Sequence, residues 1–341
     1  MVNSVPLVTP PVLERAKNLV EPALRSAVGS LDENLRLPVT YHLGWTDKDG
    51  KPSSAGAGKG VRSALALLGA EAVGSPAEAS IAGGVAVELI HNFSLIHDDI
   101  MDNDRFRRHR PTVWDFFGVG DGIVVGDAMH ALAFQVLLED TTTPHSAAAT
   151  ARLARATSAM IAGQAQDVAL DRSDVATLDA CIEMERNKTG ALLAQSVAIG
   201  AVLGGGNEAS IGALEAFGMA VGVGFQAVDD VLGIWGDSKR TGKPVGNDLR
   251  EHKKSMPIAI ALDRGGDIGD AVRAAFGEPM TDAHIADLAL RLEKAGIRDE
   301  VQSIARDYLN EAIATLELVD IEPAPRAELT ELANFIWERD S

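Results

Sequence analysis

The chain has 341 residues, of which 46% are hydrophobic and only 4% aromatic, and its formal net charge is -18. The apolar fraction is ample for a large core, and the scarcity of aromatic residues favours an all-α protein built from Ala, Leu, Val and Ile. The negative charge argues against a nucleic-acid partner, because binding to a phosphate backbone needs a positive surface. The single cysteine, Cys181, excludes an internal disulfide and fits a reducing cytoplasm.

The N-terminal part of the sequence predicts one helix and one loop. Residues 1–11 carry three prolines and no periodic pattern, so we expect a loose segment there, and we see no signal peptide. From residue 12 to about residue 28 apolar residues recur at helical spacing, and Pro22 should kink this helix or divide it in two. Residues 44–60 are polar and rich in Gly, Ser and Asp, which predicts a loop.

This loop ends in the sequence Gly-Lys-Gly-Val-Arg at residues 58–62, and an apolar helical run follows it. Lys59 and Arg62 therefore stand at the start of a helix, where unpaired backbone N–H groups also favour an anion. This arrangement suits a diphosphate. Taken alone, the segment fits ordinary exposed basic residues equally well.

The central feature of the sequence is an apolar run, residues 83–96, that leads into His-Asp-Asp-Ile-Met-Asp at residues 97–102. Asp98 and Asp102 are four residues apart and share a helix face, with Asp99 beside them. Three adjacent carboxylates repel one another unless a cation lies between them. Hard oxygen ligands in this arrangement suit Mg²⁺ that is shared with the phosphates of a substrate.

Two arginines strengthen this interpretation. Arg107 and Arg108 follow the acidic cluster within one or two turns, and guanidinium groups bind phosphate through paired hydrogen bonds. The stretch therefore predicts a site for Mg²⁺ and a diphosphate together. The alternative is a solvated acidic helix end whose arginines serve as ion-pair partners.

Three further helices are predicted at residues 121–139, 146–167 and 174–203. Lys188 and Thr189 lie in the middle of the third, where a buried ammonium group needs an anion or a charged partner unless the side chain reaches the surface. The uncharged stretch 189–207 is diluted by Gln195, Ser196 and three consecutive glycines. We therefore expect a buried helix there and no stable membrane insertion.

A second apolar helix, predicted for residues 213–228, also delivers a pair of acids, Asp229 and Asp230. A glycine-rich loop with Lys243 follows, and then Lys253. Two helices thus each present an acid pair with basic residues downstream. Two such arrangements are hard to explain as ordinary charged surface residues.

Taken together, these segments resemble the trans-polyprenyl diphosphate synthases of the class I isoprenoid synthase fold, over about residues 59–254. The motifs that carry the resemblance are Gly58-Lys59-Gly60-Val61-Arg62, Asp98-Asp99-Ile100-Met101-Asp102, Arg107-Arg108-His109-Arg110-Pro111-Thr112, Gln164 with Asp167, Lys188-Thr189, and Phe225-Gln226 through Asp230. His109 stands where the family usually has glycine. The family's second aspartate-rich motif usually reads D-D-x-x-D, and Gly233 replaces its third acid here, which puts the outer support of a metal at Asp229 in doubt.

The resemblance implies an all-α bundle of roughly ten or more helices around a central cavity. Neither an internal repeat nor a domain linker is evident, so we expect one domain over residues 1–341. The reaction implied is Mg²⁺-dependent, head-to-tail condensation of isopentenyl diphosphate with an allylic diphosphate, which is dimethylallyl, geranyl or farnesyl diphosphate. A cytoplasmic homodimer that associates through apolar helix faces is also implied.

The implied site residues fall into groups. Asp98, Asp102 and Asp229 would bridge three Mg²⁺ ions, with Asp99 and Asp230 beside them; Arg107, Lys188, Lys243 and Lys253 would grip the allylic diphosphate; Lys59, Arg62, His91 and Arg108 would bind isopentenyl diphosphate. Thr189 and Gln226 would face the carbocation as dipoles, in a cavity dry enough that water does not quench it. For His91, the plain alternative is a satisfied core histidine.

Product length should be set on the first acid-bearing helix, along which the growing chain runs toward the N-terminal end. Phe93 is large and Ser94 is small, one turn before the aspartates. By resemblance, a single aromatic residue five positions before the motif indicates a C20 product, geranylgeranyl diphosphate. Farnesyl (C15) and C25 products are the alternatives, and Phe93 could also be an ordinary core residue.

Two rival functions remain. A class I terpene cyclase shares an aspartate-rich helix and a trinuclear metal site, but it has no use for a second diphosphate site at Lys59, Arg62 and Arg108. A non-catalytic partner subunit of another prenyl synthase would keep the fold without the chemistry. Gly233 is the feature that points to the partner subunit.

Overall fold

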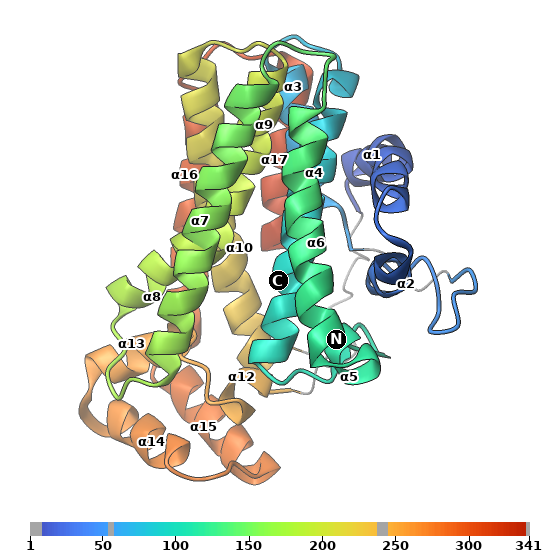
Figure 1. Cartoon of the computed structure of the whole chain (residues 1–341). Coiled ribbons are helices and arrows are strands. Elements are labelled where there is room, and N and C mark those ends of the chain that lie inside the picture. The colour runs from blue at the N-terminus through green and yellow to red at the C-terminus, as the bar shows by residue number, and fades with distance from the viewer. Residues whose placement is uncertain (1–8, 54–57, 237–244, 339–341) are drawn as a thin grey trace.

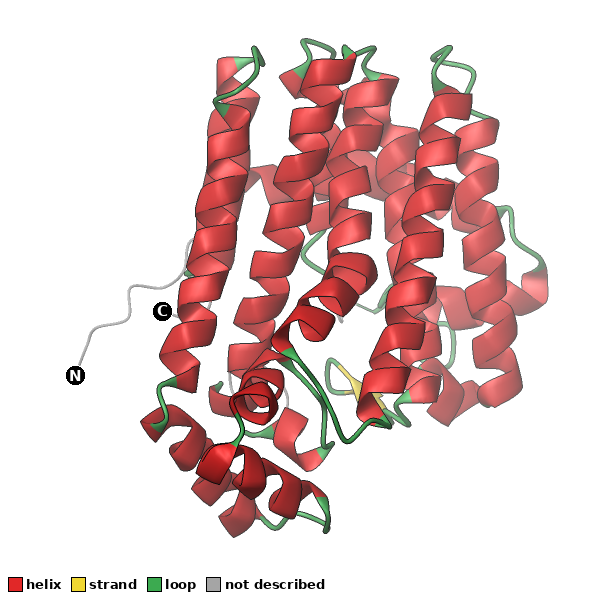
Figure 2. Cartoon of the chain, turned by 90° about the vertical axis from the view of Figure 1, so that its left-hand side faces the viewer, coloured by secondary structure: helices red, strands yellow, loops and turns green. Residues whose placement is uncertain are grey.

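Long helices stand side by side in the structure and form a bundle, with a group of shorter helices at one end (Figures 1 and 2). The structure is a computed structural model, and it describes residues 9–53, 58–236 and 245–338. Within these residues the sole β-sheet is a short antiparallel hairpin. The prediction of an all-α helical bundle is confirmed.

Two N-terminal helices, α1 (Pro11–Gly29) and α2 (Glu33–His42), pack on the outside of the bundle. Helix α3 (Val61–Ala72) lies inside it against α9, and nearly all of its residues are buried. Helix α1 begins at Pro11, and the predicted division at Pro22 is wrong, because α1 continues through it; the kink, which was the other predicted outcome, stays a prediction. Pro22 has no N–H group to donate to the carbonyl oxygen of Asn18. Both residues face solvent, so water can satisfy that oxygen.

The next elements form one side of the bundle and its open end. They are the 3₁₀ turn η1 (Ala77–Ser80), α4 (Ile81–Met101), the hairpin of β1 (Phe106–Arg107) and β2 (Arg110–Pro111), α5 (Val113–Phe117), α6 (Val119–Leu138) and α7 (Ser146–Asp171). Helix α4 packs along α6, and both also contact α7 or its neighbours. The first two predicted aspartates lie in the last turn of α4, and the residue that caps it, Asp102, is the third.

A π-helical turn interrupts the long helix that the sequence predicts at residues 174–203. The segment divides into α8 (Leu178–Glu185), the π turn η2 (Arg186–Gly190) and α9 (Ala191–Leu203). Every residue of α9 is buried, as predicted, because α9 lies in the middle of the bundle against α3, α4, α7 and α10 (Glu208–Trp235).

The second acid-bearing helix is longer than predicted. Helix α10 does not end at residue 228 but runs to Trp235, so Asp229 and Asp230 lie within it. The remaining helices are α12 (Asn247–Arg250), α13 (Met256–Arg264), α14 (Gly266–Phe276), α15 (Asp282–Lys294), α16 (Ile297–Leu316) and α17 (Pro323–Trp337). Helix α16 packs along α10, whereas α13, α14 and α15 form the group of shorter helices in Figure 1.

Three helical segments are long and apolar enough to cross a membrane by length and composition: Ala77–Met101, Val119–Leu138 and Glu208–Trp235. None is the stretch that the sequence analysis considered. In the first and third, 61% of the most apolar window is buried inside the protein, against 39% in α6. Helix α6 therefore leaves more of its apolar surface uncovered than the other two.

Candidate active site

A cavity of about 870 Å³ opens between α4, α6, α7, η2 and α10. The predicted site residues that line it are Arg62, His91, Phe93, Asp98, Arg107, Arg108, Lys188, Thr189, Gln226 and Asp229. The two acid-bearing helices therefore do meet at one hollow. Charged side chains line it together with apolar side chains of α4 and α7, among them Phe93, Met160 and Ile161.

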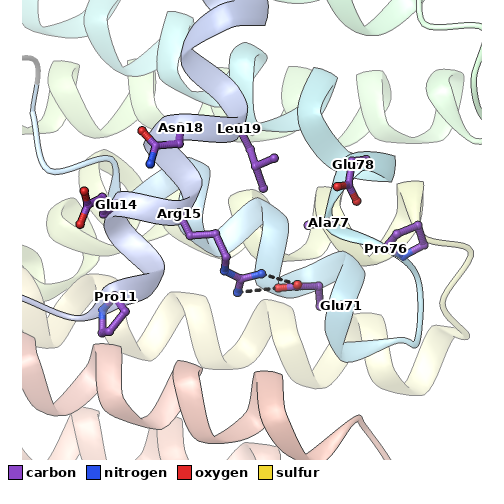
Figure 3. Close-up of a pocket in the computed structure, with 9 residues that line it drawn as sticks. All are labelled: Pro11, Glu14, Arg15, Asn18, Leu19, Glu71, Pro76, Ala77 and Glu78. Carbon is purple, nitrogen blue, oxygen red and sulfur yellow. Dashed lines mark hydrogen bonds and ion pairs between the residues drawn. The ribbon is translucent and has the colours of Figure 1, made fainter.

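A second hollow, of about 740 Å³, lies between α1 and α3 and is shown in Figure 3. Its basic side chain, Arg15, already forms ion pairs with Glu71 and with Glu328. The other charged residues that line it, Glu14 and Glu78, are acids. This hollow therefore offers no predicted site residue and no uncommitted positive charge.

Burial and neighbouring charge perturb the first aspartate motif. Removal from water raises the pKa of Asp98 to about 6; Lys188 opposes this shift, whereas the carboxylates of Asp102 and Asp167 add to it. A carboxylate held in such surroundings gains from a cation placed beside it. The site is therefore chemically suited to a divalent metal ion with oxygen ligands.

Of the five predicted metal residues, Asp98 and Asp229 line the cavity, whereas Asp102 lies outside its lining and pairs with Lys253, and Asp99 and Asp230 are buried. Asp99 is only 2% exposed, and its Oδ1 accepts hydrogen bonds from Nε (2.8 Å) and a terminal nitrogen (2.7 Å) of Arg107. Asp230 is 5% exposed and accepts from Gln226 Nε2 at 2.9 Å and from the backbone N–H of Met256 at 2.7 Å. Both carboxylates thus hold neighbouring parts of the site in place.

Lys253, in the segment between α12 and α13, reaches the first motif. Its Nζ lies 3.4 Å from Asp102 Oδ2 and 3.4 Å from Glu251 Oε2. Burial lowers the pKa of Lys253, but Asp102, Glu251 and Asp248 outweigh this effect and the pKa lies above its usual value. Lys253 is therefore a fixed positive charge beside Asp102. The predicted Lys243 lies outside the described residues.

The β1–β2 hairpin delivers the arginine pair through a strained turn. Arg107 pairs with Arg110, so Arg108 and His109 are the two turn residues, and both have positive φ (50° and 62°). Two-residue turns of this kind normally use glycine or asparagine. Holding larger residues there costs about 1–2 kcal/mol each. The strained turn places the Arg108 side chain at the cavity.

The π turn presents two adjacent side chains to the same hollow. Lys188 Nζ lies 2.5 Å from Asp167 Oδ2, and Thr189 Oγ1 donates to Gln226 Oε1 at 3.0 Å. A β-carbon on Gly163 would lie 2.3 Å from the backbone nitrogen of Lys188, so only glycine lets α7 approach this turn. Single π turns inside α-helices are often found at functional sites.

Asp230, the second acid of the second motif, contacts a further buried carboxyl group, that of Glu185. Glu185 forms a side-chain hydrogen bond with Asp230, and Cys181 Sγ lies 3.3 Å from Glu185 Oε1. Burial, and then the charge of Asp230, raise the pKa of Glu185 well above its usual value. Glu185 is therefore the neutral donor to Asp230. The sequence analysis missed it, because a glutamate in an amphipathic helix carries no signal of burial.

Of the residues predicted to bind isopentenyl diphosphate, the fold brings three to the cavity and leaves one outside it. Arg62, His91 and Arg108 line the cavity, whereas Lys59 does not, and its Nζ lies 5.2 Å from the centre of the Phe335 ring. Burial lowers the pKa of His91 well below its usual value, and Arg62, Arg107 and Arg108 lower it further. A neutral histidine among three guanidinium groups is a setting that an anion stabilises.

Phe93 lies within an aromatic group that joins two helices. Its ring centre is 5.0 Å from that of His97 and 5.0 Å from that of His130 on α6, and His130 in turn contacts Phe134 at 5.1 Å. His130, Met160 and Ile161 also line the cavity, although the sequence analysis did not select them. Their contribution depends on how α6 and α7 pack against α4.

Gln164 is a further residue of the cavity, which the sequence marks only through the motif that it shares with Asp167. It lines the cavity, and both its side-chain nitrogen and its oxygen are buried without a hydrogen-bond partner among the described residues. A buried amide with no partner is costly, so a polar ligand in this cavity would satisfy it.

Comparison with known proteins agrees with this geometry. Residues 51–289 match the polyprenyl synthetase family. The chain is 42% identical over 339 residues to a (2E,6E)-farnesyl diphosphate synthase of Mycobacterium tuberculosis H37Rv (98% of this chain, 94% of that one). It is 38% identical over 331 residues to a geranylgeranyl diphosphate synthase of the same organism (96% and 93%).

The fold leads to the same family. The crystal structure of a polyprenyl synthetase from Streptomyces coelicolor A3(2) matches with a TM-score of 0.91 and 44% identity, over 96% of this chain and 99% of that one. The agreement of sequence, fold and site places this chain in the polyprenyl synthetase family, as a prenyltransferase of the trans-prenyl diphosphate synthase type.

Proposed function

We propose that the protein condenses isopentenyl diphosphate with an allylic diphosphate to a short-chain all-trans prenyl diphosphate, and that its main product is geranylgeranyl diphosphate. The observation that carries the proposal is that Asp98 and Asp229, from two different helices, line one cavity that apolar side chains of α4 and α7 also line. The relatives include both farnesyl and geranylgeranyl diphosphate synthases, so farnesyl diphosphate is the alternative product.

The donor set of the two acid motifs fits magnesium. Asp98, Asp102 and Asp229 offer hard carboxylate oxygens, and the raised pKa of Asp98 reflects negative charge that a cation would relieve. Three Mg²⁺ ions bound there would neutralise the charge that builds up on the leaving diphosphate. Asp99 and Asp230 support this set through Arg107 and Gln226.

The basic residues divide between the two substrates. Arg107, Lys188 and Lys253 would hold the allylic diphosphate, because they stand among the acids of the first motif. Arg62, Arg108 and neutral His91 would hold isopentenyl diphosphate. A terpene cyclase needs only one diphosphate site, so this second basic group favours the condensation.

Carbon–carbon bond formation needs a carbocation that water does not reach. The bond from the allylic C1 to the diphosphate oxygen breaks, the double bond of isopentenyl diphosphate attacks C1, and the released diphosphate takes up the proton that is lost. Thr189 and Gln226 present oxygens at this point, and their mutual hydrogen bond and the one to Asp230 keep these oxygens in place as non-reacting dipoles.

The growing chain would extend along α4 until it meets the Phe93 ring. Phe93 is backed by His97 and His130, which limits its movement. We therefore retain Phe93 as the residue that ends the product at C20.

We also propose a homodimer through α5 and α6. Exposed large apolar side chains cluster there: Phe116, Val119, Ile123, Val124 and Leu138. An apolar helix face of this kind is typical of a protein–protein interface.

The test is incubation of the purified protein with Mg²⁺, isopentenyl diphosphate and each of the C5, C10 and C15 allylic diphosphates, followed by dephosphorylation and chromatography. The proposal expects geranylgeraniol as the main alcohol. Farnesol as the end product would replace the C20 assignment. Hydrocarbon released from geranylgeranyl diphosphate alone would indicate a cyclase, and no turnover would indicate a non-catalytic subunit.

A further inference from the structure

Gly233 lies on the same face of α10 as Asp229, four residues further along the helix. The space beside it is filled by another side chain. A β-carbon on Gly233 would lie 2.1 Å from Oδ2, 2.4 Å from Cγ and 2.7 Å from Oδ1 of Asp248. The whole Asp248 carboxyl group therefore rests directly against the α-carbon of Gly233.

This placement is built into the turn that contains Asp248. Gly246 has φ of +69°, which starts the short helix α12, and Leu249, the next residue after Asp248, is fully buried. The backbone oxygen of Asp248 accepts a hydrogen bond from the N–H of Lys253 at 2.9 Å. The carboxyl group is thus carried by a turn that is anchored on both sides.

The same turn faces the first acid motif. Lys253, tied to Asp248 through its backbone, makes its ion pair with Asp102 at the end of α4. The charge of Asp248 also acts on Lys253, together with Asp102 and Glu251. Asp248 therefore belongs to the acidic field between α4 and α10, and not to a separate surface cluster.

We propose that Asp248 supplies, from the turn after α10, the carboxylate that the second motif lacks at Gly233, and that position 233 must be glycine to admit it. The inference rests on the proposed function, because the carboxylate acts on the metal ion held at Asp229. Outer carboxylates that orient a metal's ligands typically contribute 10–100-fold to metal affinity. Restoring the usual aspartate at position 233 would push the Asp248 carboxylate away instead of improving the site.

The test measures binding without turnover, by calorimetric titration of inorganic pyrophosphate into the protein at fixed MgCl₂. Asp248→Asn keeps the shape and removes the charge, and we expect about 10–100-fold weaker binding. Asp270→Asn, an exposed carboxylate on α14, is the matched control and should bind within about twofold of the wild type. Gly233→Ala and Gly233→Asp should each weaken binding, because the new β-carbon displaces the carboxylate.

The decisive variant moves the acid from one position to the other. Asp248→Gly should weaken binding, and the double variant Gly233→Asp with Asp248→Gly should recover at least about tenfold of that loss, because the acid then reaches the same place from α10 itself. Circular dichroism of the metal-free proteins checks that each variant is folded.

Three results would overturn the inference: Asp248→Asn that binds like the wild type, Gly233→Asp that binds more tightly than the wild type, or a double variant no better than Asp248→Gly. If the wild type itself fails to bind pyrophosphate with Mg²⁺ and fails to turn over, the proposed function falls as well. If the wild type binds and turns over while the variants are unchanged, only the role of Asp248 falls.

Discussion

Glu185 donates a hydrogen bond to Asp230 beneath the floor of the cavity, and Asp230 accepts another from Gln226, whose oxygen bonds to Thr189. A buried residue of α8 is thereby connected to the two side chains that face the reacting carbon. Removal of the donor would leave Asp230 short of a hydrogen bond inside the protein, which typically costs about 1–3 kcal/mol.

We therefore expect Glu185→Leu to lower both the melting temperature and kcat, with little change in KM for isopentenyl diphosphate. Glu185→Gln retains a donor and should restore most of kcat. The matched control is Glu183→Leu, which makes the same change at an exposed position of α8. Thermal denaturation and steady-state kinetics provide the measurements. Equal losses in the Leu and Gln variants would contradict the hydrogen-bond role.

Phe93→Ala should lengthen the products. Phe93 lines the cavity, so removal of its ring enlarges the cavity along α4, and chains beyond C20 should accumulate at the expense of the wild-type product. Chromatography of dephosphorylated products measures the shift. Leu318→Ala, which shortens a side chain that is 80% exposed just after α16, is the control and should leave the product pattern unchanged. An unchanged pattern for Phe93→Ala would show that another residue ends the chain.

Asp98 makes the metal-free protein sensitive to pH. Its folded pKa of about 6 lies above the model-peptide value of 3.8, so the folded state binds the proton more tightly than the unfolded state. The resulting stabilisation is complete below pH 3.8 and is lost as the pH rises through 6. Asp98→Asn should therefore stabilise the metal-free protein at pH 7, by at most about 3 kcal/mol, and this gain should vanish near pH 4.

Denaturant unfolding in the presence of a chelator, at pH 4 and pH 7, measures this difference. The same variant should lose Mg²⁺-dependent pyrophosphate binding. A variant that is less stable than the wild type at pH 7 without metal would show that burial does not destabilise the charged form of Asp98.

His109→Gly should stabilise the protein. The residue has φ of 62° at an exposed turn position, and the left-handed conformation costs an L-residue about 1–2 kcal/mol. Part of this is offset by the greater freedom of glycine in the unfolded chain, so we expect a net gain of about 0.5–1 kcal/mol. Turnover should be unchanged. Destabilisation would mean that the His109 side chain makes a contact that outweighs the strain.

The proposed dimer predicts that a charge on α6 will separate the subunits. Val124 is 54% exposed on the apolar face, and Val124→Asp should convert the protein to a monomer in sedimentation velocity experiments. Val175→Asp introduces the same charge at a residue that is 70% exposed in the loop before α8, and it should not alter the oligomeric state. A wild type that sediments as a monomer would refute the proposal directly.

The parts of the site that could be predicted from the sequence are those whose signal is local. Asp98 and Asp229 each follow an apolar run of residues within a helix and belong to a motif with fixed spacing, so their shared cavity follows from the family resemblance. Other features depend on packing between distant segments. The π turn at Lys188 depends on the approach of α7 at Gly163, and the contribution of His130 depends on where α6 lies. No local pattern contains that information.

Gly233 shows the same limit more sharply. In the sequence it is a missing acid, and nothing nearby replaces it. In the structure the carboxyl group of Asp248, 15 residues further along the chain, fills the space beside it. A sequence motif describes the spacing of residues along the chain, whereas metal binding depends on where the oxygen atoms lie in space.

The π turn at Arg186–Gly190 has a consequence for the length of the chain. A π turn closes its hydrogen bonds over one residue more than an α turn, so it takes up one extra residue while the helices on either side keep their orientation. Deleting one residue at η2 should therefore convert it to an α turn and leave Cys181 and Glu185 facing α10, whereas deleting one residue inside α8 would rotate part of its buried face by about 100°. The length of the chain should thus be far less constrained at η2 than within the helices that it joins.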